Sequence, residues 1–116
     1  MELGKDLVAA SATPLVLTLL AGGDSYGYAI IKRVSELSGG QLKWTDGMLY
    51  PVLHRLEQAG LLASRWVTAE SGRRRRVYAL TKRGNRGLAE QRAVWEQFSV
   101  AIGGLLGATR PWKNPA

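Results

Sequence analysis

Four consecutive arginines, Arg73 to Arg76, stand between a Ser-Gly pair and an apolar segment. Guanidinium groups bind phosphate oxygens through paired, charge-assisted hydrogen bonds, whereas their mutual repulsion brings no gain on a surface that meets no anion. The chain has 16 basic and nine acidic residues, and the window of residues 71–86 contains no acid. The basic residues of this window match the whole net charge of +7; they are Arg73, Arg74, Arg75, Arg76, Lys82, Arg83 and Arg86. The sequence therefore favours a surface that contacts nucleic acid over a passive charged face.

Other chemistries find little support. The chain contains no cysteine and a single histidine, His54, which excludes disulfides, thiolate metal sites and multi-histidine zinc sites within one chain. It offers neither a Ser-His-Asp set nor a glycine-rich phosphate-binding loop. We therefore expect no enzymatic activity, no metal and no cofactor.

Length and hydropathy predict one cytoplasmic domain. A chain of 116 residues is long enough for one modest hydrophobic core. Its start lacks the basic segment and cleavage site of a signal peptide. Its longest apolar stretch, residues 12–21, is shorter than the roughly 20 residues that cross a bilayer.

Three short helices are predicted before the arginine run. Apolar residues recur at helical spacing in residues 12–23, 26–38 and 48–60, and glycine closes each segment. The side chains expected to cap the second and third helices are Asp24 or Ser25 and Thr45 or Asp46, respectively.

The pattern then changes to strands and one long helix. Alternating residues predict strands at 61–69 and 75–80, with a turn between them and with Tyr78 and Leu80 on the core face. Thr81 is expected to cap a final helix, residues 82–106. This order predicts a mainly α fold with a small β-hairpin, a winged helix-turn-helix followed by a long dimerisation helix. The expected domain bounds are 1–81 for the DNA-binding domain, 82–106 for the dimerisation helix and 107–116 for a flexible tail.

The third helix is the expected recognition helix, because this fold presents the outer face of that helix to the major groove. The small Gly47 allows close approach to base edges, and the Tyr50 hydroxyl can donate to a phosphate. The alternative is that Tyr50 and His54 are ordinary surface residues. The candidate DNA contacts in and just before this helix are Lys43, Thr45, Asp46, Gly47, Tyr50, Pro51, His54 and Arg55.

The turn between the two strands forms the expected wing. Arg73 and Arg74 are predicted to reach phosphates, which adds affinity without sequence discrimination. Arg75 is a third candidate DNA contact. Alternation along the strand directs either Arg75 or Arg76 back toward the protein.

The final helix predicts a homodimer. Its residues recur in alternating steps of three and four, the spacing of helices that pack along their length. A helix extending far beyond a small domain cannot bury such a seam on its own core, so a second copy is expected, although packing on the first helix is an alternative. The predicted dimer-interface residues are Leu88, Gln91, Trp95, Phe98, Ile102 and Leu105.

Three segments carry a resemblance to a known family. They are residues 26–34, which begin Tyr-Gly-Tyr, residues 48–64, in which Leu-Tyr-Pro precedes Leu-x-Arg-Leu-Glu, and residues 72–84, in which Gly-Arg-Arg precedes Tyr-x-Leu-Thr. Their order and spacing are similar to those of the PadR family of bacterial transcription regulators, and most closely to its compact, LmrR-like members. The resemblance implies a dimeric repressor that releases its operator when a small effector binds.

The resemblance also implies where such an effector would bind. In LmrR-like members a flat aromatic drug inserts between paired tryptophans at the dimer centre, and Trp95 falls at the matching place. Ser99 occupies the position of the acidic group that attracts cations in such pockets, which leaves cation selectivity open. The alternative is that Trp95 is only a dimer-core aromatic. The effector-binding residues implied are Leu7, Ala10, Ser11, Pro14, Trp95 and Ser99.

The sequence thus predicts a ligand-responsive, multidrug-binding repressor that recognises an inverted-repeat DNA operator as a homodimer. Its expected partners are double-stranded DNA, a second copy of itself and a planar aromatic effector, with no membrane. The alternative function is a winged-helix adaptor that binds other proteins without sequence-specific DNA binding.

Overall fold

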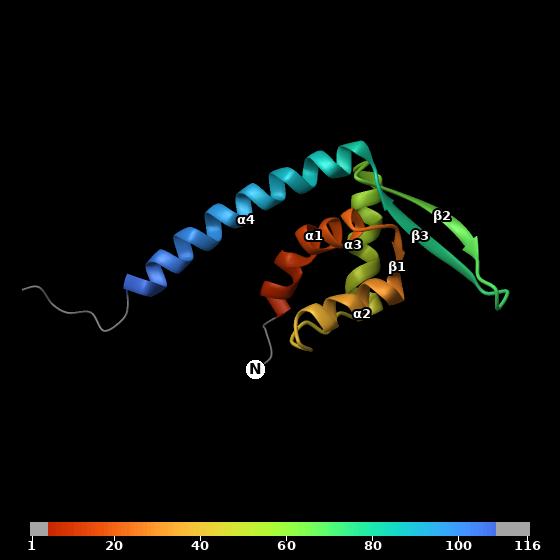
Figure 1. Ribbon diagram of the computed structural model, residues 1–116, viewed down its shortest axis with the longest axis horizontal. Helices are drawn as coiled ribbons and strands as arrows, with labels where there is room; N and C mark the ends of the chain where they lie inside the picture. The colour runs from red at the N-terminus through yellow and green to blue at the C-terminus, as the bar shows by residue number, and fades with distance from the viewer. Residues whose placement is uncertain (1–4, 109–116) are drawn as a thin grey trace, which may run out of the picture.

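The computed structural model describes the backbone of residues 5–108 and the side chains of residues 9–107. Four helices and a small antiparallel sheet form the fold, and the last helix is the longest (Figure 1). The mainly α fold class with a long C-terminal helix is therefore confirmed. The elements are α1 (Lys5–Ala21), β1 (Ser25–Tyr26), α2 (Gly27–Leu37), α3 (Asp46–Gln58), β2 (Leu62–Thr68), β3 (Arg74–Leu80) and α4 (Lys82–Ala108).

The first and last helices are longer than predicted. α1 begins at Lys5 instead of residue 12, because the alanine-rich segment before Pro14 has high helix propensity and Pro14 is accommodated inside the helix. α4 continues to Ala108, so residues 107–108 belong to the helix and not to the predicted tail. The rest of that tail, residues 109–116, lies outside the described residues.

A third strand replaces the predicted cap of α2. Ser25 and Tyr26 pair with Tyr78 and Val77 of β3, which gives a sheet of order β1-β3-β2. Pairing holds this backbone extended, so Tyr26 becomes the N-cap of α2 and makes no side-chain capping bond. The prediction that Asp24 or Ser25 caps α2 is therefore wrong.

Residue types explain the start of α3 and the tip of the hairpin. The Thr45 hydroxyl accepts a hydrogen bond from the Met48 N–H at 3.2 Å, which is one of the two predicted caps. At the tip, Gly72 has a φ of 84°, a left-handed conformation that favours glycine. Antiparallel pairing then runs from Thr68 opposite Arg74 to Leu62 opposite Leu80.

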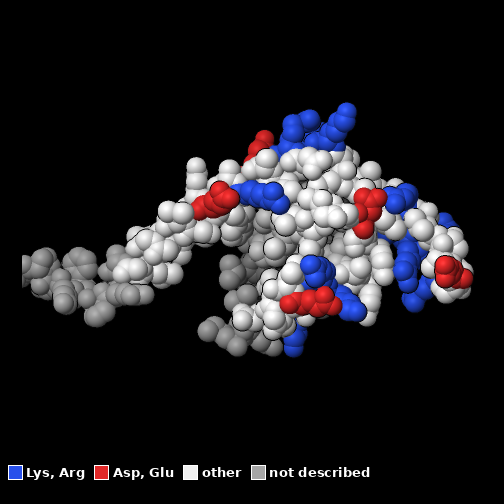
Figure 2. Space-filling view, in the orientation of Figure 1, with Lys and Arg blue, Asp and Glu red and all other residues white. Residues whose placement is uncertain are grey.

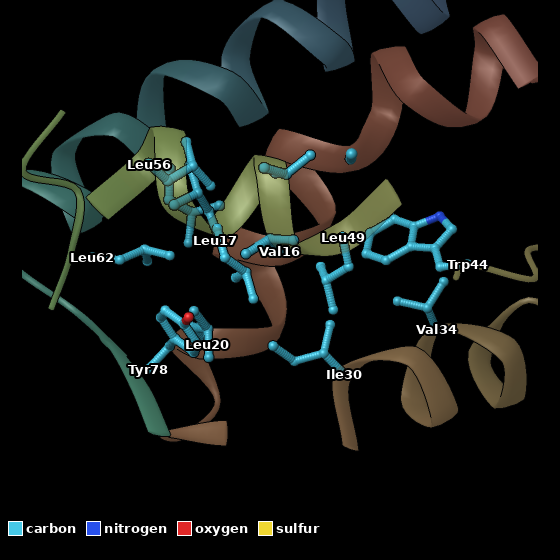
Figure 3. Packing of buried hydrophobic residues seen from close by; sticks show 14 residues of the cluster. Val16, Leu17, Leu20, Ile30, Val34, Trp44, Leu49, Leu56, Leu62 and Tyr78 are labelled. Carbon is cyan, nitrogen blue, oxygen red and sulfur yellow. The ribbon is translucent and has the colours of Figure 1, made fainter. Parts of the chain in front are cut away.

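One hydrophobic cluster holds the helices and the sheet together (Figure 3). Tyr78 and Leu62 contribute to it from the sheet, and its fully buried members include Leu17, Ile30 and Leu53, one from each of three helices. Ala12, Val16, Leu20, Val34, Trp44, Leu49, Val52, Leu56 and Leu88 complete the cluster.

Leu88 corrects the predicted dimer seam. It is only 4% exposed and belongs to the core cluster of its own chain. Its three- and four-residue spacing to later residues of α4 is real, but spacing does not say which surface covers a position. The first turns of α4 still lie on the domain, so Leu88 is buried there and not between two copies.

The junction between β3 and α4 is closely packed. Thr81 caps α4, as predicted, because its hydroxyl accepts from the Gly84 N–H at 3.0 Å. The same hydroxyl donates to the Gly60 carbonyl oxygen at 2.6 Å. A Cβ at Gly84 would overlap the carbonyl oxygen of Leu61, so only glycine allows this approach of α4 to the chain before β2.

Beyond this junction α4 extends away from the body of the domain, and α1 lies beneath its first half (Figure 1). None of the helices within residues 5–108 combines the length and hydropathy that crossing a bilayer requires.

Candidate nucleic-acid interface and a second groove

Helix α3, the start of α2 and the hairpin of β2 and β3, which we call the wing, surround one groove of about 560 Å³. We call it the wing groove. Aromatic rings and guanidinium groups dominate its walls. Its lining residues are Tyr26, Gly27, Tyr28, Tyr50, Trp66, Arg73, Arg74, Arg75, Arg76 and Tyr78.

Gly27 allows α2 and α3 to meet in this groove. A Cβ at this position would lie 2.6 Å from the hydroxyl oxygen of Tyr50, well inside van der Waals contact. Because glycine leaves that space free, the Tyr50 ring lies across the first turn of α2 while remaining exposed to solvent. Tyr28, on the next position of α2, is also exposed. Phenolic hydroxyls therefore lie on the same surface as the wing arginines.

Aromatic rings hold the wing arginines. The guanidinium carbon of Arg74 lies 4.7 Å from the centre of the Trp66 ring, and that of Arg76 lies 5.6 Å from it. Arg75 lies 4.4 Å over the ring of Tyr26. These distances are within the range of cation–π attraction, which restricts each side chain to fewer rotamers.

Arg76 is also tied to α3. Its Nη2 lies 3.4 Å from Oε1 of Glu57 in α3, and its Nε donates to the Ser64 hydroxyl at 2.9 Å. Ser64 in turn donates to Glu57 through a short hydrogen bond. On the other side of the sheet Arg65 pairs with Asp24 at 2.9 Å. Arg76 is thus the arginine of the run that points back toward the body, and these contacts fix the wing relative to α3.

Tyr78 closes the base of the wing groove from the core side. Burial raises the pKa of its hydroxyl, and the Arg76 guanidinium opposes this effect without cancelling it. The Tyr78 hydroxyl therefore stays protonated, and neutral, at physiological pH.

Most of the remaining predicted DNA contacts are exposed on α3 or just before it, outside the lining of the wing groove. A Cβ at Gly47 would meet only the Thr45 hydroxyl, at 3.9 Å, so the start of α3 is open to solvent. Arg55 differs, because its Nη2 donates to the Thr13 hydroxyl of α1 at 3.1 Å. The structure therefore does not bring Arg55 to the wing groove. The exposed residues are Lys43, Thr45, Asp46, Gly47, Pro51 and His54.

The basic residues of the window 71–86 do not form one surface. Four lie on the wing, and Lys82, Arg83 and Arg86 are exposed on the first two turns of α4. Figure 2 shows these as separate groups, one over the wing and one where α4 begins. Arg83 lies over Gly60 at the end of α3, with Nη1 3.6 Å from the position of a Cβ there. The turn at Thr81 separates charges that are adjacent in sequence.

A second groove, of about 810 Å³, lies between α1 and α4. We call it the helix groove. Its lining is mostly apolar, with Arg92 and Glu96 as its charged residues, and the Trp95 ring meets the Phe98 ring edge-on at 5.7 Å. The lining residues are Ser11, Pro14, Leu15, Thr18, Leu42, Gln91, Arg92, Trp95, Glu96, Ser99 and Val100.

Four of the six residues implied for effector binding lie in this groove, namely Ser11, Pro14, Trp95 and Ser99. Ala10 is exposed on α1 and does not line it. The side chain of Leu7 lies outside the described residues.

The second half of α4 exposes a large apolar surface. Of the predicted seam, Phe98, Ile102 and Leu105 are exposed, Trp95 is half-buried, and the half-buried Gln91 lines the helix groove. Exposed apolar side chains of this density on a helix mark an interaction surface. The exposed large apolar residues of α4 are Val94, Phe98, Val100, Ile102, Leu105 and Leu106.

Several groove residues were not predicted as site residues. Trp66 lies opposite Arg76 in the hairpin, so pairing the two predicted strands could have placed it beside the arginines. Leu15 and Thr18 follow Ser11 and Pro14 at helical spacing and share their face of α1. Leu42 lies in the irregular segment before α3, and nothing local indicated it.

Comparisons with known proteins agree with this geometry. Residues 16–90 match the model of the transcriptional regulator PadR-like family. The chain is 33% identical over 88 residues to the transcriptional regulator YqjI of Escherichia coli, which covers 76% of this chain and 41% of that protein. It is 42% identical over 67 residues to the transcriptional regulator Rv3488 of Mycobacterium tuberculosis, covering 58% of this chain and 62% of that protein. The chain thus spans about half the length of these relatives.

Solved structures extend the match to α4. A PadR family regulator from Eggerthella lenta superposes with a TM-score of 0.76 at 35% identity, over 87% of this chain and 86% of that one. A transcriptional regulator from Clostridium thermocellum superposes with a TM-score of 0.79 at 27% identity, over 88% and 96% of the two chains. The family consists of transcriptional regulators and not of enzymes. This chain belongs to the PadR-like family of transcriptional regulators.

Proposed function

We propose that this protein is a bacterial, cytoplasmic repressor that binds an inverted-repeat operator as a homodimer and leaves it when a planar apolar molecule occupies the helix groove. The wing groove is the observation that carries the proposal. It joins the recognition helix, the start of α2 and four arginines in one surface that is both basic and aromatic.

The exposed face of α3 enters the major groove in this proposal. The open start of α3, at Gly47, allows close approach to base edges, and Tyr50 and His54 lie on successive turns of the helix. The wing then contacts phosphates beside the major groove of the DNA through Arg73 and Arg74, with Arg75 as a further contact. Direct base contacts from α3 provide specificity, whereas the wing provides affinity that depends on salt.

A second copy covers the apolar surface of α4. Phe98, Ile102 and Leu105 follow the spacing of helices that pack along their length, and solvent exposure of such a surface is unfavourable. A two-fold dimer presents two recognition helices, so the operator is expected to have half-sites about one helical turn apart, roughly 34–36 Å.

The helix groove receives the effector. Trp95 offers a flat, polarisable face, and Pro14, Leu15 and Val100 supply apolar walls around it. In the dimer, Trp95 of each copy approaches the same axis, so a planar ligand can stack on both rings.

Fluorescence polarisation against the DNA upstream of its own gene tests this proposal. We expect tight binding to one inverted repeat, weaker binding to a scrambled duplex of equal length, and a steep loss of affinity with salt. Equal affinity for the two duplexes at physiological salt would contradict the repressor and favour the winged-helix adaptor.

A further inference from the structure

Trp66 is the most exposed aromatic side chain of the wing, and the function proposed above assigns it no role. It is 56% exposed in the middle of β2, so it contributes little to the core. Exposure of a single aromatic side chain is common, so the contacts of the ring decide its role. Two guanidinium groups lie within 6 Å of its ring, which makes the ring the common neighbour of Arg74 and Arg76.

Strand register explains this arrangement. Trp66 lies directly opposite Arg76, and Arg74 lies two residues before Arg76 in β3, on the same face of the hairpin. Cross-strand neighbours at direct and diagonal positions are close enough for long and aromatic side chains to touch. The alternation of the sheet therefore places one ring beside two of the four arginines.

The two arginines have different second partners. Arg76 is held by Glu57 of α3 and by Ser64 of β2, so its charge is used within the protein. Arg74 has no acidic partner among the ion pairs of the described residues, and its guanidinium group rests on Trp66 at the rim of the wing groove. A continuous row of contacts thus leads from α3 through Glu57, Arg76 and Trp66 to Arg74.

We propose that Trp66 is a positioning residue for DNA binding: it holds the guanidinium group of Arg74 in the orientation that binds a backbone phosphate, fixed relative to the recognition helix. Trp66 itself does not contact DNA. This inference rests on the proposed function, because it requires that the protein binds DNA. It requires only a contact to a backbone phosphate of the duplex and no particular operator sequence.

The ring acts by reducing the freedom of Arg74 before DNA arrives. An arginine side chain loses rotamer entropy when it is immobilised at an interface. Stacking on Trp66 removes part of that freedom in the free protein, so less is lost on binding. Because the positive charge remains in either case, the ring changes affinity and not the number of phosphates neutralised.

Polarisation titrations of three variants separate these effects. Trp66→Leu is expected to bind about five-fold more weakly than the parent, the size of one exposed cation–π contact, with an unchanged salt slope. Trp66→Phe keeps an aromatic face and should recover most of the affinity. Arg74→Gln removes the charge and should lower the salt slope by about 0.9. Val67→Ala, an exposed apolar change on the same strand but the opposite face, is the matched control and should bind like the parent.

A double-mutant cycle provides the decisive test. If Trp66 acts only through Arg74, adding Trp66→Leu to Arg74→Gln causes no further loss. An equal five-fold loss in both backgrounds would mean that Trp66 acts by a route other than Arg74, either by contacting DNA directly or through Arg76. An unchanged affinity of Trp66→Leu would mean that the ring does not position Arg74. Either result overturns the inference.

The same titrations on a scrambled duplex separate this inference from the repressor proposal. A phosphate contact is independent of sequence, so Trp66→Leu should weaken operator and scrambled duplex by the same factor. A parent protein without sequence preference contradicts the repressor, yet the loss caused by Trp66→Leu on any duplex still supports the positioning role. A parent that binds no duplex even at low salt overturns both.

Discussion

The wing groove and the helix groove differ in almost every physical property. The wing groove is basic and aromatic, and all its walls come from one chain, with each of Arg74, Arg75 and Arg76 held by an aromatic ring or an ion pair. The helix groove is mostly apolar, and it continues into a surface of α4 that no part of the described chain covers. In the proposed function, the first groove binds a polyanion through side chains that are already held in place, whereas a second copy of the chain completes the second groove.

This difference indicates how one small domain can combine two kinds of recognition. Charges at the wing give long-range attraction that salt weakens, whereas apolar surfaces at α4 act only at contact. The two grooves are linked through α1 and α3, because the wall of the helix groove is formed by α1 and Thr13 of α1 binds Arg55 of α3. In the proposed function, a shift of α1 on ligand binding would be transmitted to α3 through this hydrogen bond.

Breaking the α4 surface is expected to have the largest effect. Replacing Phe98 and Ile102 with glutamate puts charges into the proposed seam, so the protein should become monomeric in analytical ultracentrifugation. Losing the second half-site contact should weaken operator binding about 100-fold or more. The control is Glu90→Gln, an exposed change on the same helix outside the seam. A double variant that remains dimeric would show that another surface holds the two copies together.

Removing positive charge from the wing tests the role of the wing groove. Arg73→Ala with Arg74→Ala should reduce the slope of log affinity against log salt by about two units, because two phosphate contacts are lost. Dimerisation and ligand binding should be unaffected, since the helix groove lies elsewhere. Lys82→Ala with Arg83→Ala removes equal charge from the separate group at the start of α4. An equal fall in slope for that pair would contradict the separation of the two basic surfaces.

Trp95→Ala tests whether the helix groove binds ligands. Planar dyes should quench the tryptophan emission of the parent protein, and the variant should lose that response, with at least about ten-fold weaker dye binding. Operator affinity should stay within two-fold of the parent, roughly 0.4 kcal/mol, when the variant is a dimer in analytical ultracentrifugation, because Trp95 does not line the wing groove. Equal dye binding by parent and variant would leave Trp95 as a dimer-core aromatic only.

The smallest effect is expected at Tyr78, which belongs both to the core and to the wing groove. Its folded-state pKa is raised by burial, so the folded state holds this proton more tightly than the unfolded state does. Its contribution to stability is fully present below the ordinary pKa of about 10 and is lost as the pH rises through the raised value. Urea unfolding at increasing alkaline pH should show this loss, and Tyr78→Phe should reduce it.

Much of the fold follows from local residue types. Thr45 and Thr81 cap helices, Gly72 bends the hairpin, and alternation in residues 74–80 places Tyr78 in the core. Each of these depends on neighbours in sequence, so a single chain is enough to predict it. The resemblance to the family predicted the same order of helices and strands as the residue patterns did.

The features that sequence could not predict depend on contacts between distant segments. Ser25 and Tyr26 are too few to show the alternating pattern of a strand, and they form one only by pairing with β3. Leu88 fits the spacing of the seam, but its burial depends on where α4 leaves the domain. Arg55 has an exposed position on α3, and its orientation is set by Thr13, 42 residues earlier. The spacing of side chains along a helix or strand shows which residues share a face. Only the tertiary structure shows what covers that face.

Gly84 has a consequence for the DNA as well as for the fold. Its missing side chain lets α4 rest against Leu61, and this contact fixes the angle at which the helix leaves the domain. A helix of 27 residues is a lever of roughly 40 Å. One degree of tilt at its base therefore moves its far end by roughly 0.7 Å. In the proposed dimer, Gly84 therefore influences which spacing between operator half-sites the protein tolerates, although this residue does not contact DNA.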